Sequence, residues 1–139
     1  HEKERLEYYR LVRNVKKVYP ISKEINQAII ETYEYLQTLP NEKARQKHLK
    51  RVEKGLKEQY TARMKKLSFT QGKLLIKLID RQSNSTSYEL VKAFMGPFKA
   101  GFYQAFAALF GASLKKEYDP LGEDKLTERV VLLVENGQI

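Results

Sequence analysis

The sequence has no cysteine and only two histidines, His1 and His48. Without cysteine, the chain can have no disulfides, no thiolate metal sites and no cysteine nucleophile. His1 is terminal, and His48 lies in the charged stretch RQKHLKR, where we expect it on the surface. No Ser-His-Asp arrangement, glycine-rich phosphate loop or metal-ligand spacing is present. Carboxylates are therefore the only candidate catalytic groups, and we expect no metal and no cofactor.

Long apolar stretches, glycine and proline are also scarce. The longest apolar stretch covers residues 100–112, well short of the roughly 20 residues that span a bilayer. We therefore expect no transmembrane segment. With 42% hydrophobic residues and no low-complexity tract, the composition is that of a globular protein. A chain of 139 residues suits one domain, covering residues 1–139.

Apolar residues recur at helical spacing along most of the chain, and no stretch alternates with a period of two. The pattern predicts an all-α fold that forms a single compact domain. Breaks are expected at Pro20, at Pro40 and at the Gly96-Pro97 pair, which gives about seven helices. The longest helix follows Pro40, with Asn41 as its N-cap.

Two further helix starts are expected in the second half of the chain. Thr70 is a possible cap for the stretch that follows it, and Asp119 caps the final helix with Pro120 in the first turn. In that final helix, acidic residues near the start would complement the helix dipole.

Basic charge is concentrated in the first half of the chain. Residues 1–68 hold 17 of the 26 Lys and Arg residues but 9 of the 17 acidic residues. We therefore divide the domain into basic amphipathic helices over residues 1–68 and a compact core over 69–139. On the long helix, five lysines alternate steps of four and three, which aligns them in a stripe opposite the apolar seam. This lysine stripe consists of Lys43, Lys47, Lys50, Lys54 and Lys57.

The stretch TQGKLLIKLIDRQ, residues 70–82, mixes charge with apolar residues. On a helical projection, Leu and Ile residues fill one arc, and the charged residues fall together in the remaining arc. We expect these charges to form a solvent-facing stripe, consisting of Lys73, Lys77, Asp80 and Arg81.

Three polar or small residues lie on faces that are otherwise apolar. Gln71 and Gly72 lie on the apolar face of that helix, and Gln104 lies among small residues of the helix expected over 97–113. That second helix is apolar on all sides, which predicts a central, enclosed position. We expect both glutamines to be buried and hydrogen-bonded, because an unpaired buried amide costs about 1–3 kcal/mol. A glycine at position 72 would permit close approach of another segment.

The stretches LSFTQGKLLIKLIDRQSNSTSYELVK and QAFAALFGASLKKEYDPLGEDKLTERVVLLVENG closely resemble domain-of-unknown-function family 4294, which is found largely in Bacteroidetes. The resemblance is densest over residues 67–137. It implies an exported protein with a signal peptide upstream of His1 and a periplasmic or other cell-envelope location. It implies no established activity. The candidate binding residues within the resembling pattern are Gln71, Lys73, Lys77, Asp80, Arg81, Gln104, Tyr118, Asp119, Asp124 and Glu128.

These observations favour a non-catalytic binding or scaffold module of the cell envelope, with an unknown envelope protein or an anionic surface as partner. One alternative is a hydrolase-like enzyme whose carboxylates come from Glu117, Asp119, Glu123, Asp124 and Glu128. Another is a basic module whose lysine stripe binds anionic lipid or nucleic acid. Export, as the resemblance implies it, makes nucleic acid the less compatible partner.

Opposite charges in the second half of the chain are segregated along the sequence. We predict that at least one of Lys73, Lys77 and Arg81 forms an ion pair with Asp119, Asp124 or Glu128. Such pairs would form either a structural clasp between two helices or a polar cleft that also involves Tyr118.

Overall fold

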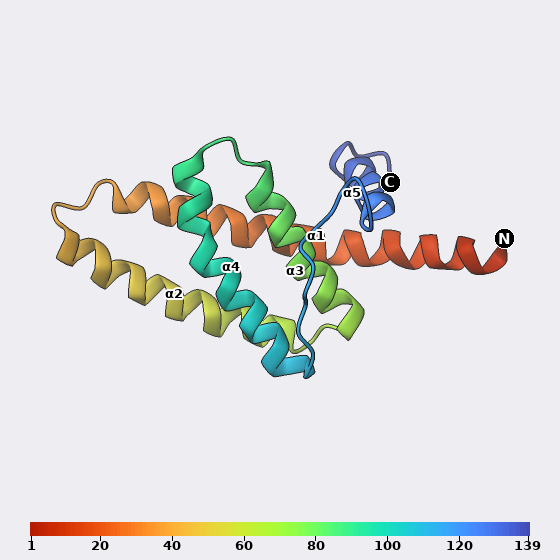
Figure 1. Cartoon of the computed structure of the whole chain (residues 1–139), viewed down its shortest axis with the longest axis horizontal. Coiled ribbons are helices and arrows are strands. Elements are labelled where there is room, and N and C mark those ends of the chain that lie inside the picture. Colours follow the sequence, from red (N-terminus) through yellow and green to blue (C-terminus); the bar gives the residue numbers. More distant parts are fainter.

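The computed structural model describes all residues from 1 to 139 and contains five helices and no strand (Figure 1). The predicted all-α fold is confirmed, but the predicted number of about seven helices is wrong. The helices are α1 (Glu2–Leu36), α2 (Glu42–Met64), α3 (Phe69–Ser85), α4 (Glu89–Phe110) and α5 (Lys125–Glu135).

Two of the expected helix breaks do not occur. Pro20 lies inside α1, and Pro97 lies inside α4. Each proline removes one backbone hydrogen bond. Both helices nevertheless continue, because residues on either side of each proline are buried on the same face. Val18 and Ile25 flank Pro20 in this way, while the prolines themselves are exposed to solvent.

Helix α1 organises the molecule, since it contacts each of the other four helices. Helix α2 turns back along the second half of α1, and α4 runs beside α2 (Figure 1). Helix α3 crosses α1 near its middle, and α5 packs on α1 at the end of the molecule that carries the N-terminus. Side chains from all five helices meet in one core, whose largest fully buried members include Phe106, Ile25, Ile29, Met64, Leu75, Leu78 and Val130.

The expected close approach at Gly72 is present. A Cβ atom added at this position would lie 2.8 Å from Cε2 of Phe110 on α4. The neighbour is therefore an aromatic ring, which packs against the bare backbone of α3. Phe110 also contacts Phe106 and Phe69, so the glycine makes room for an aromatic cluster between α3 and α4.

The expectation that residues 97–113 form an enclosed helix is wrong. These residues belong to the longer α4, which buries its aromatic face through Phe98, Phe102 and Phe106. Its face of small residues is only partly covered: Ala105 is buried, but Ala100, Ala108 and Gln104 are exposed. The prediction that Gln104 is buried is therefore wrong, because helices α1, α2 and α3 cover α4 on one side only.

No helix combines the length and the apolar character that crossing a membrane would require. This agrees with the short apolar stretches of the sequence.

Candidate functional site

Helix α3 supplies the residues at the centre of the candidate site. It begins at a capping box, in which the Ser68 hydroxyl accepts from the Gln71 amide and the Gln71 side chain accepts from the Ser68 amide. The N-cap is therefore Ser68 and not Thr70. Gln71 also donates to the Asn14 side chain at 3.2 Å. It is hydrogen-bonded as predicted, but it is half-buried instead of buried, because capping holds it at the end of the helix.

The charged face of α3 is not the solvent-facing stripe that the sequence predicts. Asp80 is fully buried, Lys77 is 5% exposed, and Arg81 is half-buried. Only Lys73, in the first turns, is exposed. The chain between α4 and α5 runs over this face of α3, followed by the start of α5 (Figure 1). The charges therefore lie between packed segments and require partners there.

Asp80 is the most deeply buried charge in the molecule. One carboxylate oxygen accepts from the Tyr118 backbone amide at 2.7 Å, and the other forms an ion pair with Lys99 of α4. Asp80 thus links α3 to α4 and to the connection before α5. The nearby Tyr103 hydroxyl is buried without a partner, and burial together with the Asp80 charge raises the pKa of Tyr103 to about 12.

Arg81 binds two carboxylates of α5. Its guanidinium donates to Glu128 at 2.7 and 3.0 Å in a bidentate pair, and to Glu135 at 3.3 Å. The hydrogen bonds from Arg81 hold the pKa of Glu128 below its usual range, and the bonds to Glu128 raise the pKa of Arg81. Glu135 also accepts a hydrogen bond from the hydroxyl of Tyr19. Burial of Tyr19, together with this hydrogen bond, raises its pKa to about 12.

Lys77 and Asp124 form a further ion pair, at 2.9 Å, with side chains that are 6% and 13% exposed. Lys77 also donates to the Glu117 carbonyl at 3.4 Å, and Asp124 accepts from the Asp119 amide at 2.8 Å. The predicted ion pairing between α3 and the acidic residues before and within α5 is thus confirmed by two pairs.

Tyr118 completes the network from within the connection. Its side chain is buried, and its hydroxyl donates to Glu128 at 2.9 Å. Burial, with this bond, raises the pKa of Tyr118 well above its usual range. We call this network of ion pairs and hydrogen bonds the clasp, consisting of Lys77, Asp80, Arg81, Lys99, Tyr118, Asp124, Glu128 and Glu135.

Comparison with protein families gives a match to Domain of unknown function (DUF4294) over residues 1–133. The chain belongs to this family. Comparison with curated proteins and with solved structures gives no match. The family domain covers all of α1 to α4 and most of α5, so the clasp lies entirely within it except for Glu135.

Some sequence-predicted site residues of the family domain lie outside the clasp. Lys73 and Gln104 are exposed and form no ion pair or hydrogen bond with it. Asp119 is exposed and contributes its backbone amide, not its carboxylate. It does not cap the final helix, because residues 119–124 form turns and α5 begins at Lys125 with Asp124 at the N-cap position.

Sequence reasoning missed Lys99, Tyr19 and Glu135. Lys99 had a detectable signal, because it is the only charged residue between Lys92 and Lys115. A lone charge in an apolar helix requires a partner. Tyr19 and Glu135 are 116 residues apart, and neither stands out from its surroundings in the sequence.

Two observations bear on the chemistry that this site could perform. The clasp carboxylates Asp80, Asp124 and Glu128 each face a cation, and the pKa of Glu128 is lowered, whereas a general acid requires a raised one. No group of three His, Cys, Asp or Glu side chains is placed to hold a metal ion. The geometry is that of a structural network that fixes α5 and its connection on α3.

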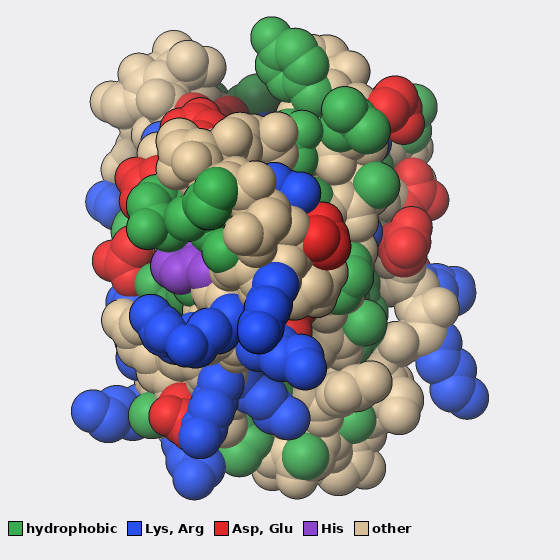
Figure 2. Space-filling model, turned by 90° about the vertical axis from the view of Figure 1, so that its left-hand side faces the viewer, with side chains coloured by type: hydrophobic (Ala, Val, Ile, Leu, Met, Phe, Trp, Pro, Cys, Tyr) green, Lys and Arg blue, Asp and Glu red, His purple; other side chains and the backbone are tan.

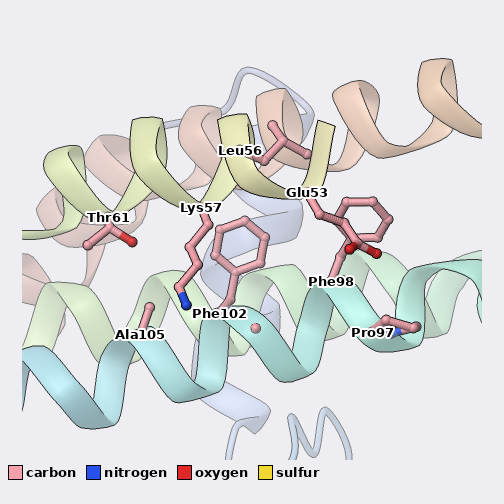
Figure 3. Close-up of a pocket in the computed structure, with 9 residues that line it drawn as sticks. Glu53, Leu56, Lys57, Thr61, Pro97, Phe98, Phe102 and Ala105 are labelled. Atoms are coloured by element: carbon pink, nitrogen blue, oxygen red, sulfur yellow. The ribbon is translucent and has the colours of Figure 1, made fainter. Parts of the chain in front are cut away.

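An apolar groove lies between α2 and α4, away from the clasp. Phe98 and Phe102 rise from α4 toward α2, while Lys57 extends from α2 toward α4 (Figure 3). The groove encloses about 200 Å³, below the roughly 300–1,000 Å³ of small-molecule sites. We interpret it as imperfect packing between the two helices.

The lowered pKa of Glu128 predicts how stability depends on pH. The Arg81–Glu128 pair stabilises the fold above the usual glutamate pKa of 4.5, and this contribution is lost as the pH falls through the lower folded-state value. We expect Glu128→Gln to be less stable than wild type at pH 7. This gap in the free energy of unfolding should narrow toward pH 3. Urea unfolding across this range measures the gap. Glu117→Gln, at an exposed residue without a cation partner, should show little gap at any pH.

Proposed function

We propose that this chain is a non-catalytic binding module of the cell envelope, which docks on an anionic surface through the lysine stripe. One observation carries the proposal. All five lysines are exposed on the single uninterrupted helix α2, and none lies within ion-pair distance of a carboxylate. Charges of one sign that are aligned and unpaired create a field that attracts a surface of the opposite sign.

The opposite face of α2 explains why the stripe stays exposed. Leu56, Tyr60 and Met64 are buried against the body of the protein, so the helix cannot rotate without exposing them. Figure 2 shows the end of the molecule that carries the α1–α2 turn, where Lys and Arg side chains gather with few acidic side chains among them. The surface is therefore held in place by the core behind it.

The clasp supports a non-catalytic role. Its carboxylates are neutralised by neighbouring cations, which leaves no carboxyl group in an apolar site for acid catalysis. Among anionic surfaces, we favour lipid over nucleic acid. The lysine stripe contains no arginine, and the resemblance to an exported family supports an envelope partner.

The proposal predicts steep, salt-dependent binding to anionic liposomes. Each lysine near an anionic membrane contributes about 1 kcal/mol. Changing all five stripe lysines to glutamine should therefore lower binding to phosphatidylglycerol-containing vesicles by at least about 100-fold. Vesicle sedimentation at low and high salt measures the effect.

A matched control removes the same charge elsewhere. Changing Lys3, Lys16, Lys17, Lys115 and Lys125 to glutamine alters five exposed lysines outside α2. This variant should keep most of the binding. Equal losses in the two variants, or binding that ignores salt, would show that the stripe is not the docking surface. Tighter binding to duplex DNA than to vesicles at the same salt would favour the nucleic-acid alternative.

A further inference from the structure

A polar cleft of about 640 Å³ lies at the opposite end of the molecule from the α1–α2 turn. It is lined by residues of the N-terminal half of α1, of the first turns of α3 and of the segment around the start of α5. This volume is within the range of small-molecule sites, roughly 300–1,000 Å³. The cleft uses none of the lysines of the α2 stripe.

Three cations line this cleft without a carboxylate partner. Arg10 and Arg13 come from α1 and Lys73 comes from α3, and none of them lies within ion-pair distance of an acid. Lys77 also lines the cleft, but it differs from these three cations because Asp124 already neutralises its charge. Because these three cations line a concave site and have no carboxylate partner, they are available to an anion. The planar guanidinium groups match the geometry of a phosphate.

The remaining polar groups of the cleft restrict the kind of anion. Thr70 and Thr127 bring hydroxyl groups, which can donate to phosphate oxygens or accept from a ligand. Glu7 and Glu123 also line the cleft, and Glu123 has only a loose pair with the exposed Lys116 at 3.8 Å. Carboxylates repel a second anionic group but accept hydrogen bonds from hydroxyls. The cleft thus combines cations that suit an anionic group with acceptors and hydroxyls that suit hydroxyl groups of the same ligand.

We propose that this cleft binds a small phosphorylated polyol, such as a sugar phosphate. Arg10, Arg13 and Lys73 hold the phosphoryl group. The hydroxyl groups lie toward Glu7 and Thr127. The assignment goes beyond docking on an anionic surface, because it gives the domain a second, soluble ligand at a separate site.

Isothermal titration calorimetry with the full chain tests the proposal, using glucose 6-phosphate, inorganic phosphate and glucose as probes. Glucose 6-phosphate should bind saturably at one site, and more tightly than either fragment. The variant Arg10→Gln/Arg13→Gln/Lys73→Gln should weaken binding at least about tenfold, since hydrogen bonds to charged groups contribute about 1.5–3 kcal/mol each. All three residues are exposed, so the variant should fold.

The control variant Lys43→Gln/Lys47→Gln/Lys50→Gln removes the same charge from α2 and should leave the affinity for glucose 6-phosphate within about twofold of wild type. It should weaken vesicle binding, which the cleft variant should retain. The proposal is overturned by the absence of saturable binding, by equal weakening in both variants, or by equal affinity for inorganic phosphate and the sugar phosphate. In these cases the docking surface on α2 remains testable by itself.

Discussion

Replacing Asp80 by alanine is expected to lower the free energy of unfolding by about 3–5 kcal/mol, because it breaks a buried ion pair and leaves the partner charge behind. Asp80 is fully buried, and its carboxylate meets Lys99 from α4 and the Tyr118 amide from the connection before α5. Without it, the largely buried Lys99 ammonium and the Tyr118 amide lose their acceptors. The loss therefore affects the packing of three segments.

Urea unfolding followed by circular dichroism measures this loss. Glu117→Ala serves as the control, because it removes the same charge from an exposed residue of the adjoining segment. If Asp80→Ala does not fold, Asp80→Asn keeps an acceptor for the Tyr118 amide and should be intermediate in stability. A stability of Asp80→Ala close to that of the control would contradict the structural role of the clasp.

Changing Lys77 to methionine is expected to cost about 3–5 kcal/mol, and to loosen α5 first. Methionine fills the space of the lysine stem but leaves the Asp124 carboxylate unpaired at 13% exposure. It also removes the hydrogen bond to the Glu117 carbonyl, which holds the connection on α3. Hydrogen exchange should therefore accelerate in residues 117–135 more than in α1 or α2.

Lys73→Met is the matched control for this experiment. It lies one helical turn earlier on α3, is exposed, and has no ion pair. Its stability and its exchange pattern should stay close to wild type. Faster exchange spread evenly over the whole chain in Lys77→Met would show that Lys77 supports the global core and not the attachment of α5.

The amphipathic pattern of the sequence predicted some features of the molecule well. Residues 42–64 carry a narrow apolar seam opposite aligned lysines, and the structure places Leu56 inside and the lysines outside. A local pattern suffices here because the five lysines are exposed and none forms an ion pair, although Lys57 also lines the groove toward α4. The ion pairs of Lys77 and Arg81 were also predicted, from the segregation of opposite charges.

The environment of those pairs could not be predicted in the same way. A helical projection shows that Lys77, Asp80 and Arg81 share a face, but not what covers that face. The cover is the connection before α5, which has no periodic pattern. The same limit explains Gln104, whose helix is apolar all round but is covered on one side only.

The helix count failed for a different reason. Pro20 and Pro97 were expected to end helices, because a proline removes a backbone donor. In the structure, residues on both sides of each proline are buried together, and tertiary packing overrides the local cost. Val18 and Ile25 are seven residues apart, which is about two helical turns, and so lie on the same face of one continuous helix. The spacing of apolar residues across Pro20 therefore already indicated that the helix continues through the proline.

The central claim is that buried ion pairs fasten α5 to α3, and a double-mutant cycle on Lys77 and Asp124 tests it most directly. The variants are Lys77→Met, Asp124→Asn and the two together, with Lys92 and Glu89 as an exposed control pair at 3.7 Å. We predict a coupling energy of about 1–3 kcal/mol for the buried pair, so the double variant should lose less stability than the sum of the two single variants. The exposed control pair should show no measurable coupling. Additive losses at Lys77 and Asp124 would contradict the account.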